Sequence, residues 1–287
     1  MKKLISLLSL FIVVACQAQT VDEVLAKFEN AVGGEDRLAA IRSLQITSTL
    51  KFDMMNQNLS ITLNTIRDRN KFFRRQVSGV MGMGNSYTIL TKDEGYTYSP
   101  IARGFGGNGF GGPGGGGPPR GAAPGGGGDN ANKPVALDSL QRGNLAYELE
   151  LEGPFAPLIN YAAKGHKVEL LGTAKANKTD CYKVKLTTKG GQEMIYYIST
   201  TDYLVVQTEG AVKVMLNEIG MTPILNMMGS DPRANQKITM QYNEYKSFGG
   251  IKFPVKQRLQ YSALDMQIET SDIKINEPID NKWYTMD

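Results

Sequence analysis

The sequence is poor in the residues that build metal centres and disulfide frameworks. Among 287 residues there are two cysteines and one histidine, His166. A single histidine rules out a cluster of histidine ligands around a metal. Cys16 lies in an apolar run at the start of the chain, which leaves Cys181 alone in the remainder. A disulfide framework is therefore excluded, and we expect no metal site.

Strong net charge and long apolar runs are also missing. The formal charge is +4, and two of those charges belong to Lys2 and Lys3, so the rest of the chain carries about +2. This balance does not favour nucleic acid as a partner. The apolar run that ends at Ala15 is too short to span a bilayer permanently. A hydrophobic content of 41% is enough for one large all-β domain, although two domains stay open.

Residues 1–18 have the form of a secretory signal, with two lysines, an apolar run, and then small or polar residues. Two processing sites are open. The motif Val-Val-Ala-Cys resembles a lipobox, in which residues 1–15 would be removed and Cys16 acylated. Cleavage before Gln19 by ordinary signal peptidase is the alternative. Either way we expect an exported protein of the periplasm or outer membrane, which touches a membrane only through a lipid on Cys16.

Residues 165–209 form the centre of the predicted architecture, because they have the pattern of four short strands joined by turns. Apolar and polar side chains alternate with the period of two that is typical of half-buried antiparallel strands. Glycine, asparagine and aspartate occupy the connections. The residues expected to share one face of this sheet are Val168, Leu170, Tyr182, Val184, Leu186, Met194, Tyr196 and Ile198.

The same alternation predicts further strands on both sides of this centre, each wet on one face, for a total of about ten. A hairpin is expected where two of them flank the turn Asn56-Gln57-Asn58. The additional strands are predicted at residues 44–54, 59–63, 71–77, 86–91, 96–99, 237–245, 251–262 and 266–275.

Helices are predicted at two places, and residues 37–41 are expected to add another helical turn. Thr20 and Glu23 form a capping-box pattern before an amphipathic helix at residues 21–32, which Gly33 and Gly34 end. Its apolar face must pack on something, and the concave face of a curved sheet is the expected partner. Residues 137–149 have weaker helical character and predict a second helix over the same concavity.

Residues 103–129 are dominated by glycine with proline, and such a segment buries too little apolar surface to order itself. We interpret it as a surface insertion in a single domain that spans residues 20–287. Two windows in it match the dinucleotide-binding fingerprint by letters, but neither lies between a strand and a helix. We treat both as chance matches.

A methionine-rich segment at residues 212–228 has two interpretations: a loop that fills core space, or a lid that lines a cavity. On the second interpretation, it and the helix at residues 21–32 supply the candidates for lining a lipid-binding cavity. These candidates are Val24, Leu25, Phe28, Val214, Met215, Ile219, Met221 and Leu225.

Enzymatic chemistry has little support in the sequence. There is no Gly-x-Ser-x-Gly elbow, and acidic residues show no paired motif. His166 lies between Lys164 and Lys167 in a predicted turn, where we expect an exposed residue without a chemical role. The sequence therefore predicts no catalytic residue, no cofactor and no enzyme.

Short segments along most of the chain carry a family resemblance. They are residues 31–34, 38–44, 95–100, 182–186, 196–198, 245–254 and 276–279. Together with the leader, they resemble the LolA-type outer-membrane lipoprotein-sorting family, in the form found in exported proteins of Bacteroidetes-like bacteria. No motif here matches the family's gating arginine, so no residue role is transferred.

The resemblance implies a mainly β fold of the α+β class: a strongly curved, unclosed antiparallel half-barrel lidded by one or more helices. It also implies that an apolar concavity binds a lipid or a lipoprotein acyl chain, in outer-membrane lipoprotein sorting or transport. Other envelope proteins are further expected partners. The alternative is a non-catalytic structural or interaction lipoprotein of the outer membrane with the same fold and a filled core.

The leader gives a first prediction: the protein isolated from its native envelope lacks the N-terminal apolar run. Mass spectrometry is expected to show either an acylated Cys16 or a terminus near Gln19, because both processing routes remove the apolar run. An intact Met1 in the envelope fraction would contradict export.

The Gly-rich segment gives a second prediction: removal of residues 103–129 and closure with a short linker leaves the protein folded. Loop-closure entropy changes slowly with loop length, so the melting temperature is expected to change little. Thermal unfolding followed by circular dichroism tests this. Loss of a cooperative transition would mean that the segment packs against the domain.

Overall fold

The computed structural model describes residues 19–54, 57–79, 84–100, 133–221, 236–261 and 264–285. The leader with Cys16, the Gly-rich insertion and Leu225 lie outside these described residues. Within them, no helix is both long enough and apolar enough to cross a bilayer.

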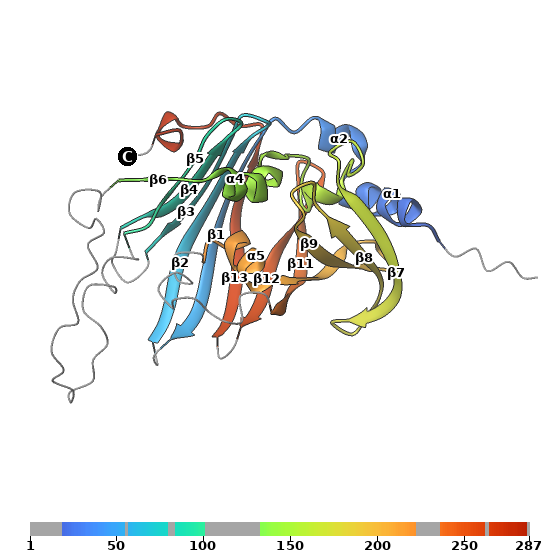
Figure 1. Ribbon diagram of the computed structural model, residues 1–287. Coiled ribbons are helices and arrows are strands. Elements are labelled where there is room, and N and C mark those ends of the chain that lie inside the picture. The colour runs from blue at the N-terminus through green and yellow to red at the C-terminus, as the bar shows by residue number, and fades with distance from the viewer. Residues whose placement is uncertain are drawn as a thin grey trace, which may run out of the picture.

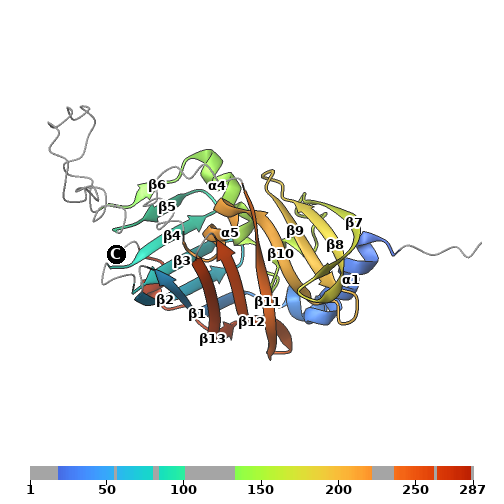
Figure 2. The same ribbon diagram turned by 90° about the horizontal axis from the view of Figure 1, so that it is seen from below.

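The described strands form one antiparallel sheet whose two edges, β6 and β7, do not pair with each other. The first and last long strands, β1 and β13, pair in its middle. Figures 1 and 2 show the sheet bent into two wings, β2–β6 and β7–β10. The expected unclosed half-barrel is confirmed, with thirteen strands rather than about ten. The strands are β1 (Ser43–Met54), β2 (Gln57–Asp68), β3 (Phe72–Ser78), β4 (Ser86–Thr91), β5 (Gly95–Tyr98), β6 (Val135–Ala136), β7 (Lys167–Ala176), β8 (Thr179–Thr187), β9 (Glu193–Ser199), β10 (Val205–Ala211), β11 (Lys237–Phe248), β12 (Ile251–Tyr261) and β13 (Leu264–Ile275).

One face of the sheet, called the inside face here, carries the main hydrophobic core. Leu44, Leu63, Tyr196, Tyr242 and Ile268 mark it on five strands. Alternation along each strand puts these side chains on the same side. A bulge between β1 and β13 skips Ser271 in the pairing, which changes the face occupied by the residues that follow it.

The N-terminal helix forms as its sequence predicts. The Thr20 hydroxyl accepts a hydrogen bond from the Glu23 backbone N–H, and the Glu23 carboxylate accepts one from the Thr20 N–H. Its apolar side chains join the inside core, and the Phe28 ring meets the Phe155 ring edge to face at 6.2 Å. The helices are α1 (Val21–Val32), α2 (Glu35–Ala39), α4 (Ser139–Leu145) and α5 (Val212–Glu218), with 3₁₀ turns η1 (Ala146–Leu149), η2 (Ala156–Leu158) and η3 (Asn281–Trp283).

The second predicted helix does not cover the core. Residues 137–149 instead form α4 followed by η1, and no side chain of α4 is buried. Leu140 is 72% exposed. The role expected of this helix is taken by η1 and the segment after it, because Glu148 and Leu151 are buried there.

The expectation that every strand is wet on one face is wrong for β9. Six of its seven residues are buried, because a second small cluster covers its outer side. That cluster includes Cys181, Ile195 and Tyr197. Cys181 is a free thiol, and burial raises its pKa.

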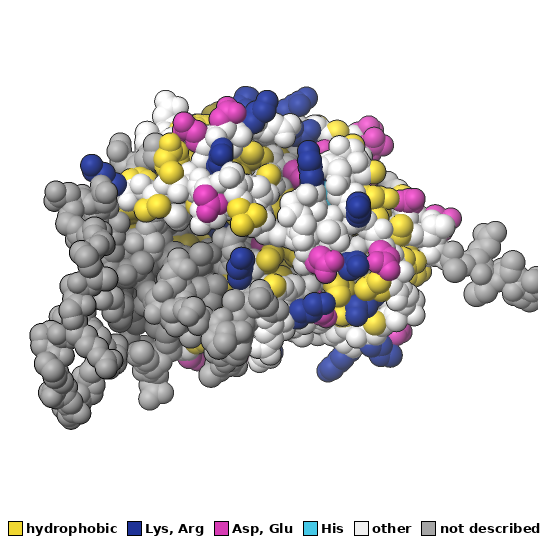
Figure 3. All heavy atoms as spheres, viewed as in Figure 1, with side chains coloured by type: hydrophobic (Ala, Val, Ile, Leu, Met, Phe, Trp, Pro, Cys, Tyr) yellow, Lys and Arg dark blue, Asp and Glu magenta, His cyan; other side chains and the backbone are white. Residues whose placement is uncertain are grey.

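Charged side chains of both signs are interspersed on the surface seen in Figure 3. Several form ion pairs across strands, such as Lys185 with Glu169 at 3.1 Å and Lys175 with Asp180 at 3.3 Å. Exposed pairs of this kind contribute little stability.

Candidate functional site

A half-enclosed cavity of about 200 Å³ lies against the inside face. Its walls come from β1, β2, β3, β9, β11, β12 and β13, together with α5 and the segment that joins η1 to η2. More of its surface is apolar than polar, and the charged side chains gather around η1 and the end of α5. The apolar members are Leu44, Ile46, Leu63, Pro154, Phe155, Ala156, Pro157, Met194, Ile219, Phe253, Pro254, Ile268 and Ile273.

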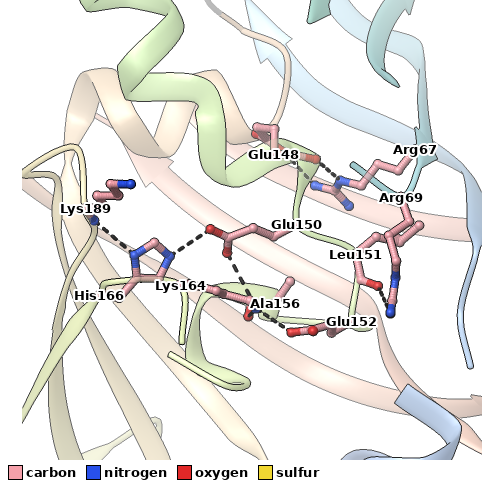
Figure 4. Close-up of polar contacts among 10 residues, drawn as sticks. All are labelled: Arg67, Arg69, Glu148, Glu150, Leu151, Glu152, Ala156, Lys164, His166 and Lys189. Atoms are coloured by element: carbon pink, nitrogen blue, oxygen red, sulfur yellow. Dashed lines mark hydrogen bonds and ion pairs between the residues drawn. The ribbon is translucent and has the colours of Figure 1, made fainter. Parts of the chain in front are cut away.

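The segment from η1 to η2, residues 146–158, crosses the inside face and is called the strap here. Arg69 on the β2–β3 turn holds it, because its guanidinium donates to the backbone carbonyl of Leu151 at 2.6 Å (Figure 4). It also donates to the backbone carbonyl of Leu38 at 3.0 Å. Gly153 in the strap has φ +102°, and a Cβ there would lie 2.7 Å from Leu38. This close approach requires glycine.

Phe155 projects from the strap into the cavity. Its backbone is left-handed, with φ 56°, which is unusual for a bulky side chain. The ring meets the rings of Tyr242 and Tyr196 edge to face, with centroid separations of 4.9 Å and 6.1 Å, in addition to that of Phe28. These contacts offset the backbone strain, and they join α1, the strap and the sheet in one aromatic cluster.

Glu148 lies at the polar end of the cavity between two arginines. Arg67 on β2 reaches its Oε2 at 2.6 Å, and Arg75 on β3 reaches its Oε1 at 2.8 Å. Arg75 also donates to the backbone carbonyl of Asn217 in α5 at 3.0 Å. Burial alone would raise the Glu148 pKa, but the two guanidinium groups, Arg75 first, lower it below its usual value. Arg75 and Glu148 thus fasten both the strap and α5 to the sheet.

Glu218, at the end of α5, lines the same polar end without a hydrogen bond or ion pair among the described residues. Burial and the neighbouring Glu148 carboxylate raise its pKa to about 7. Two buried donors here also have no partner in the described part of the chain: the Tyr147 hydroxyl and Arg75 Nε. This end of the cavity therefore has unused hydrogen-bonding capacity.

A second polar network holds the outer side of the strap. Lys164 makes ion pairs with Glu152 at 2.5 Å and Glu150 at 3.7 Å, and it donates to the Ala156 carbonyl at 2.6 Å (Figure 4). Burial raises the Glu150 pKa to about 7. The strap is therefore held by charge-assisted contacts on both sides of the cavity.

The expectation that His166 is exposed is wrong. It is 6% exposed, its Nδ1 accepts from the Lys189 backbone N–H at 3.0 Å, and its Nε2 lies 2.9 Å from Glu150 (Figure 4). A neutral ring with its proton on Nε2 satisfies both contacts. Burial, then Lys164 and Lys189, lower the His166 pKa. Its role in the fold is to position Glu150.

The structure places the residues predicted to line a cavity in two different environments. Ile219 lines the cavity. The other described candidates are buried in the main core outside the cavity wall, and Leu225 lies outside the described residues, so its role stays a prediction. The core members are Val24, Leu25, Phe28, Val214, Met215 and Met221. The described part of the methionine-rich segment therefore acts chiefly as core filling.

The sequence interpretation missed the charged residues of the strap. Glu148, Glu150 and Glu152 alternate with Leu149 and Leu151, which is the pattern of an extended segment and was available in the sequence. The two arginines that hold Glu148 come from different strands, so no local pattern indicates that pairing. In the described part of the chain, no group of three or more His, Cys, Asp or Glu residues could hold a metal ion.

No model of a known protein family and no curated protein matches the sequence. The structure is similar to that of a LolA superfamily protein from Nitrosomonas europaea, at 11% identity over 93% of this chain and 98% of that one, with a TM-score of 0.53. The chain has a LolA-like fold. A DUF1329 family protein from Desulfovibrio piger is similar at 10% identity over 93% and 97% of the two chains, with a TM-score of 0.52. At this identity the LolA-like likeness concerns the fold alone.

Replacing Glu148 or Glu218 at the polar end by glutamine is expected to change the free energy of unfolding in opposite directions. Glu148→Gln leaves Arg75 without its counter-charge and is expected to cost about 3–5 kcal/mol of unfolding free energy at pH 8. Glu148 has a pKa lowered from its ordinary value of 4.5, so it stays ionised at pH 5 and the cost is expected to persist there. Denaturant unfolding at pH 5 and pH 8 measures the unfolding free energy of this variant and of Glu218→Gln.

Glu218→Gln is expected to stabilise the protein at pH 8 by on the order of 1–3 kcal/mol and to have little effect at pH 5. The Glu218 pKa is raised from 4.5 to about 7, so the native state loses stability as the pH rises from the ordinary pKa towards 7, and glutamine removes the loss. Equal effects of the two substitutions at pH 8 would contradict this assignment of charge.

Proposed function

We propose that this is an exported cell-envelope protein that binds a lipid or lipoprotein acyl chain noncovalently in the cavity under the strap. The observation that carries the proposal is the cavity itself: a half-enclosed space with a predominantly apolar lining on the inside face of an unclosed sheet. Burying an acyl chain there gains about 0.8 kcal/mol per methylene, less the cost of ordering the ligand.

The cavity volume limits what it holds. At about 200 Å³ it is smaller than the roughly 300–1,000 Å³ of typical ligand pockets. It therefore suits part of one chain rather than several chains side by side. Affinity is expected to rise with chain length until the apolar wall is covered.

Binding without catalysis is part of the proposal. The chain's one histidine is occupied by Glu150 and the Lys189 backbone, and it does not line the cavity. Ser48, a hydroxyl in the wall, is hydrogen-bonded to Thr270 at 3.0 Å. Neither group is paired as a nucleophile with its base. Export is supported by the leader pattern of residues 1–18.

A structural or interaction protein of the outer membrane is the second candidate. It is favoured by the tight core beside the cavity, where Val24, Phe28 and Met215 are fully buried. In that function the inside face is filled by the protein's own side chains, and the cavity has no ligand.

A substitution that fills the cavity separates these two functions. Ile46 on β1 is partly buried and lines the cavity, so Ile46→Trp is expected to weaken acyl-chain binding at least about tenfold, the equivalent of two displaced methylenes. Displacement of a fluorescent fatty acid measures the affinity, and native mass spectrometry of envelope-purified protein tests for co-purified lipid.

Thr49→Trp is the matched control. Thr49 belongs to the same strand but alternates with the inward-facing Ser48 and Leu50, so the added ring lies on the opposite face. This variant is expected to bind like the wild type. If the folded wild-type protein carries no lipid and binds no acyl chain of any length, the filled-core function replaces the proposal.

A further inference from the structure

The polar end of the cavity has an uneven set of charges. Arg67 and Arg75 are both permanently cationic, and they share one counter-ion, Glu148. Glu218 is the next carboxyl group in the wall, and it makes no hydrogen bond or ion pair among the described residues. When Glu218 is protonated, the group has one excess positive charge. When Glu218 is ionised, the charges balance.

An anionic ligand head is therefore bound favourably when Glu218 is protonated and unfavourably when Glu218 is ionised. With Glu218 protonated, a carboxylate balances the excess charge of the arginines and can accept a hydrogen bond from the Glu218 hydroxyl. With Glu218 ionised, the same carboxylate adds a second negative charge beside Glu218 in a partly desolvated space, which is unfavourable. A cationic head has no such advantage beside Arg67 and Arg75.

We propose that the polar end of the cavity is a subsite for the carboxylate head of a free long-chain fatty acid, bound together with one proton that resides on Glu218. The proposal rests on the proposed function, because the chain of the ligand occupies the apolar part of the cavity. It adds that the preferred ligand is a free carboxylate rather than an esterified chain. The buried Tyr147 hydroxyl and Arg75 Nε are additional donors beside this subsite.

The other titratable groups around Glu218 do not change their protonation state near neutral pH, with one exception. The Glu148 pKa is lowered, and burial raises the pKa values of Tyr147, Tyr196 and Tyr242. Glu150 on the strap is the exception, with a pKa raised to about 7. The charged and titratable groups that line the cavity with Glu218 are Arg67, Arg75, Tyr147, Glu148, Glu150, Tyr196 and Tyr242.

Proton linkage fixes the direction of the pH dependence. A free fatty acid is ionised at neutral pH, as a side-chain carboxyl is, with an ordinary pKa of about 4.3. Below the Glu218 pKa of about 7 the proton is already in place. Above it, each unit of pH is expected to lower dodecanoate affinity about tenfold, because binding must take a proton from solvent.

Isothermal titration calorimetry on the mature full-length protein tests the proposal. Dodecanoate is titrated near pH 8 in two buffers with different ionisation enthalpies, and the difference is expected to report uptake of about one proton per ligand. Methyl dodecanoate has the same acyl chain without the charge, and it is expected to bind with no proton uptake. Dodecylammonium, with a cationic head, is expected to bind more weakly than dodecanoate at pH 7.

Two variants assign the proton. Glu218→Gln keeps a hydrogen-bond donor and cannot ionise, so it is expected to bind dodecanoate with no proton uptake and nearly constant affinity between pH 7 and pH 8.5. Glu150→Gln is the matched control, because it neutralises the other carboxyl group with a pKa near 7. It is expected to keep the proton uptake and the pH dependence of the wild type.

The possible results separate this inference from the proposed function. Binding of both dodecanoate and methyl dodecanoate without proton uptake would overturn the carboxylate subsite and leave acyl-chain binding in place. Proton uptake that survives in Glu218→Gln, or is lost in Glu150→Gln, would overturn the assignment to Glu218. Failure of every ligand to bind folded protein would overturn both proposals.

Discussion

The buried contact between Arg75 and Glu148 is the interaction on which the site depends. It joins β3 to the strap, and the same guanidinium also binds a backbone carbonyl of α5. Arg67 completes the pairing, so that both oxygens of a carboxylate that is 1% exposed have a partner. A buried charge left unpaired is costly, so these contacts specify where the strap and α5 lie as well as holding them there.

The position of the strap in turn creates the cavity. Because Arg69 and Lys164 fix its backbone on either side, Phe155 is presented to the inside face in a left-handed conformation that the aromatic contacts offset. The result is an apolar wall with a polar end, rather than a uniformly packed core. A site with one apolar wall and a few convergent polar groups is the usual form of a small-molecule binding site.

Much of the fold could be predicted because its signals are local. The capping box at Thr20 and Glu23 and the period-two alternation in β1, β8 and β9 each depend on residues close in sequence, and the structure has the helix and strands there. The errors arose where tertiary context outweighs local preference. His166 resembles a turn residue but is buried by Glu150 and the Lys189 backbone, and Leu140 in α4 remains exposed.

The sequence by itself determined the antiparallel meander, the N-terminal helix that packs against its inside face, and the scarcity of catalytic and metal-binding side chains. It did not determine the cavity. Arg67, Arg75, Glu148 and Glu218 come from two strands, a 3₁₀ turn and a helix, and residues separated by up to 151 positions in the numbering meet there. Their pairing, and the raised pKa of Glu218, depend on distances and burial that exist only after the sheet bends and the strap closes over it.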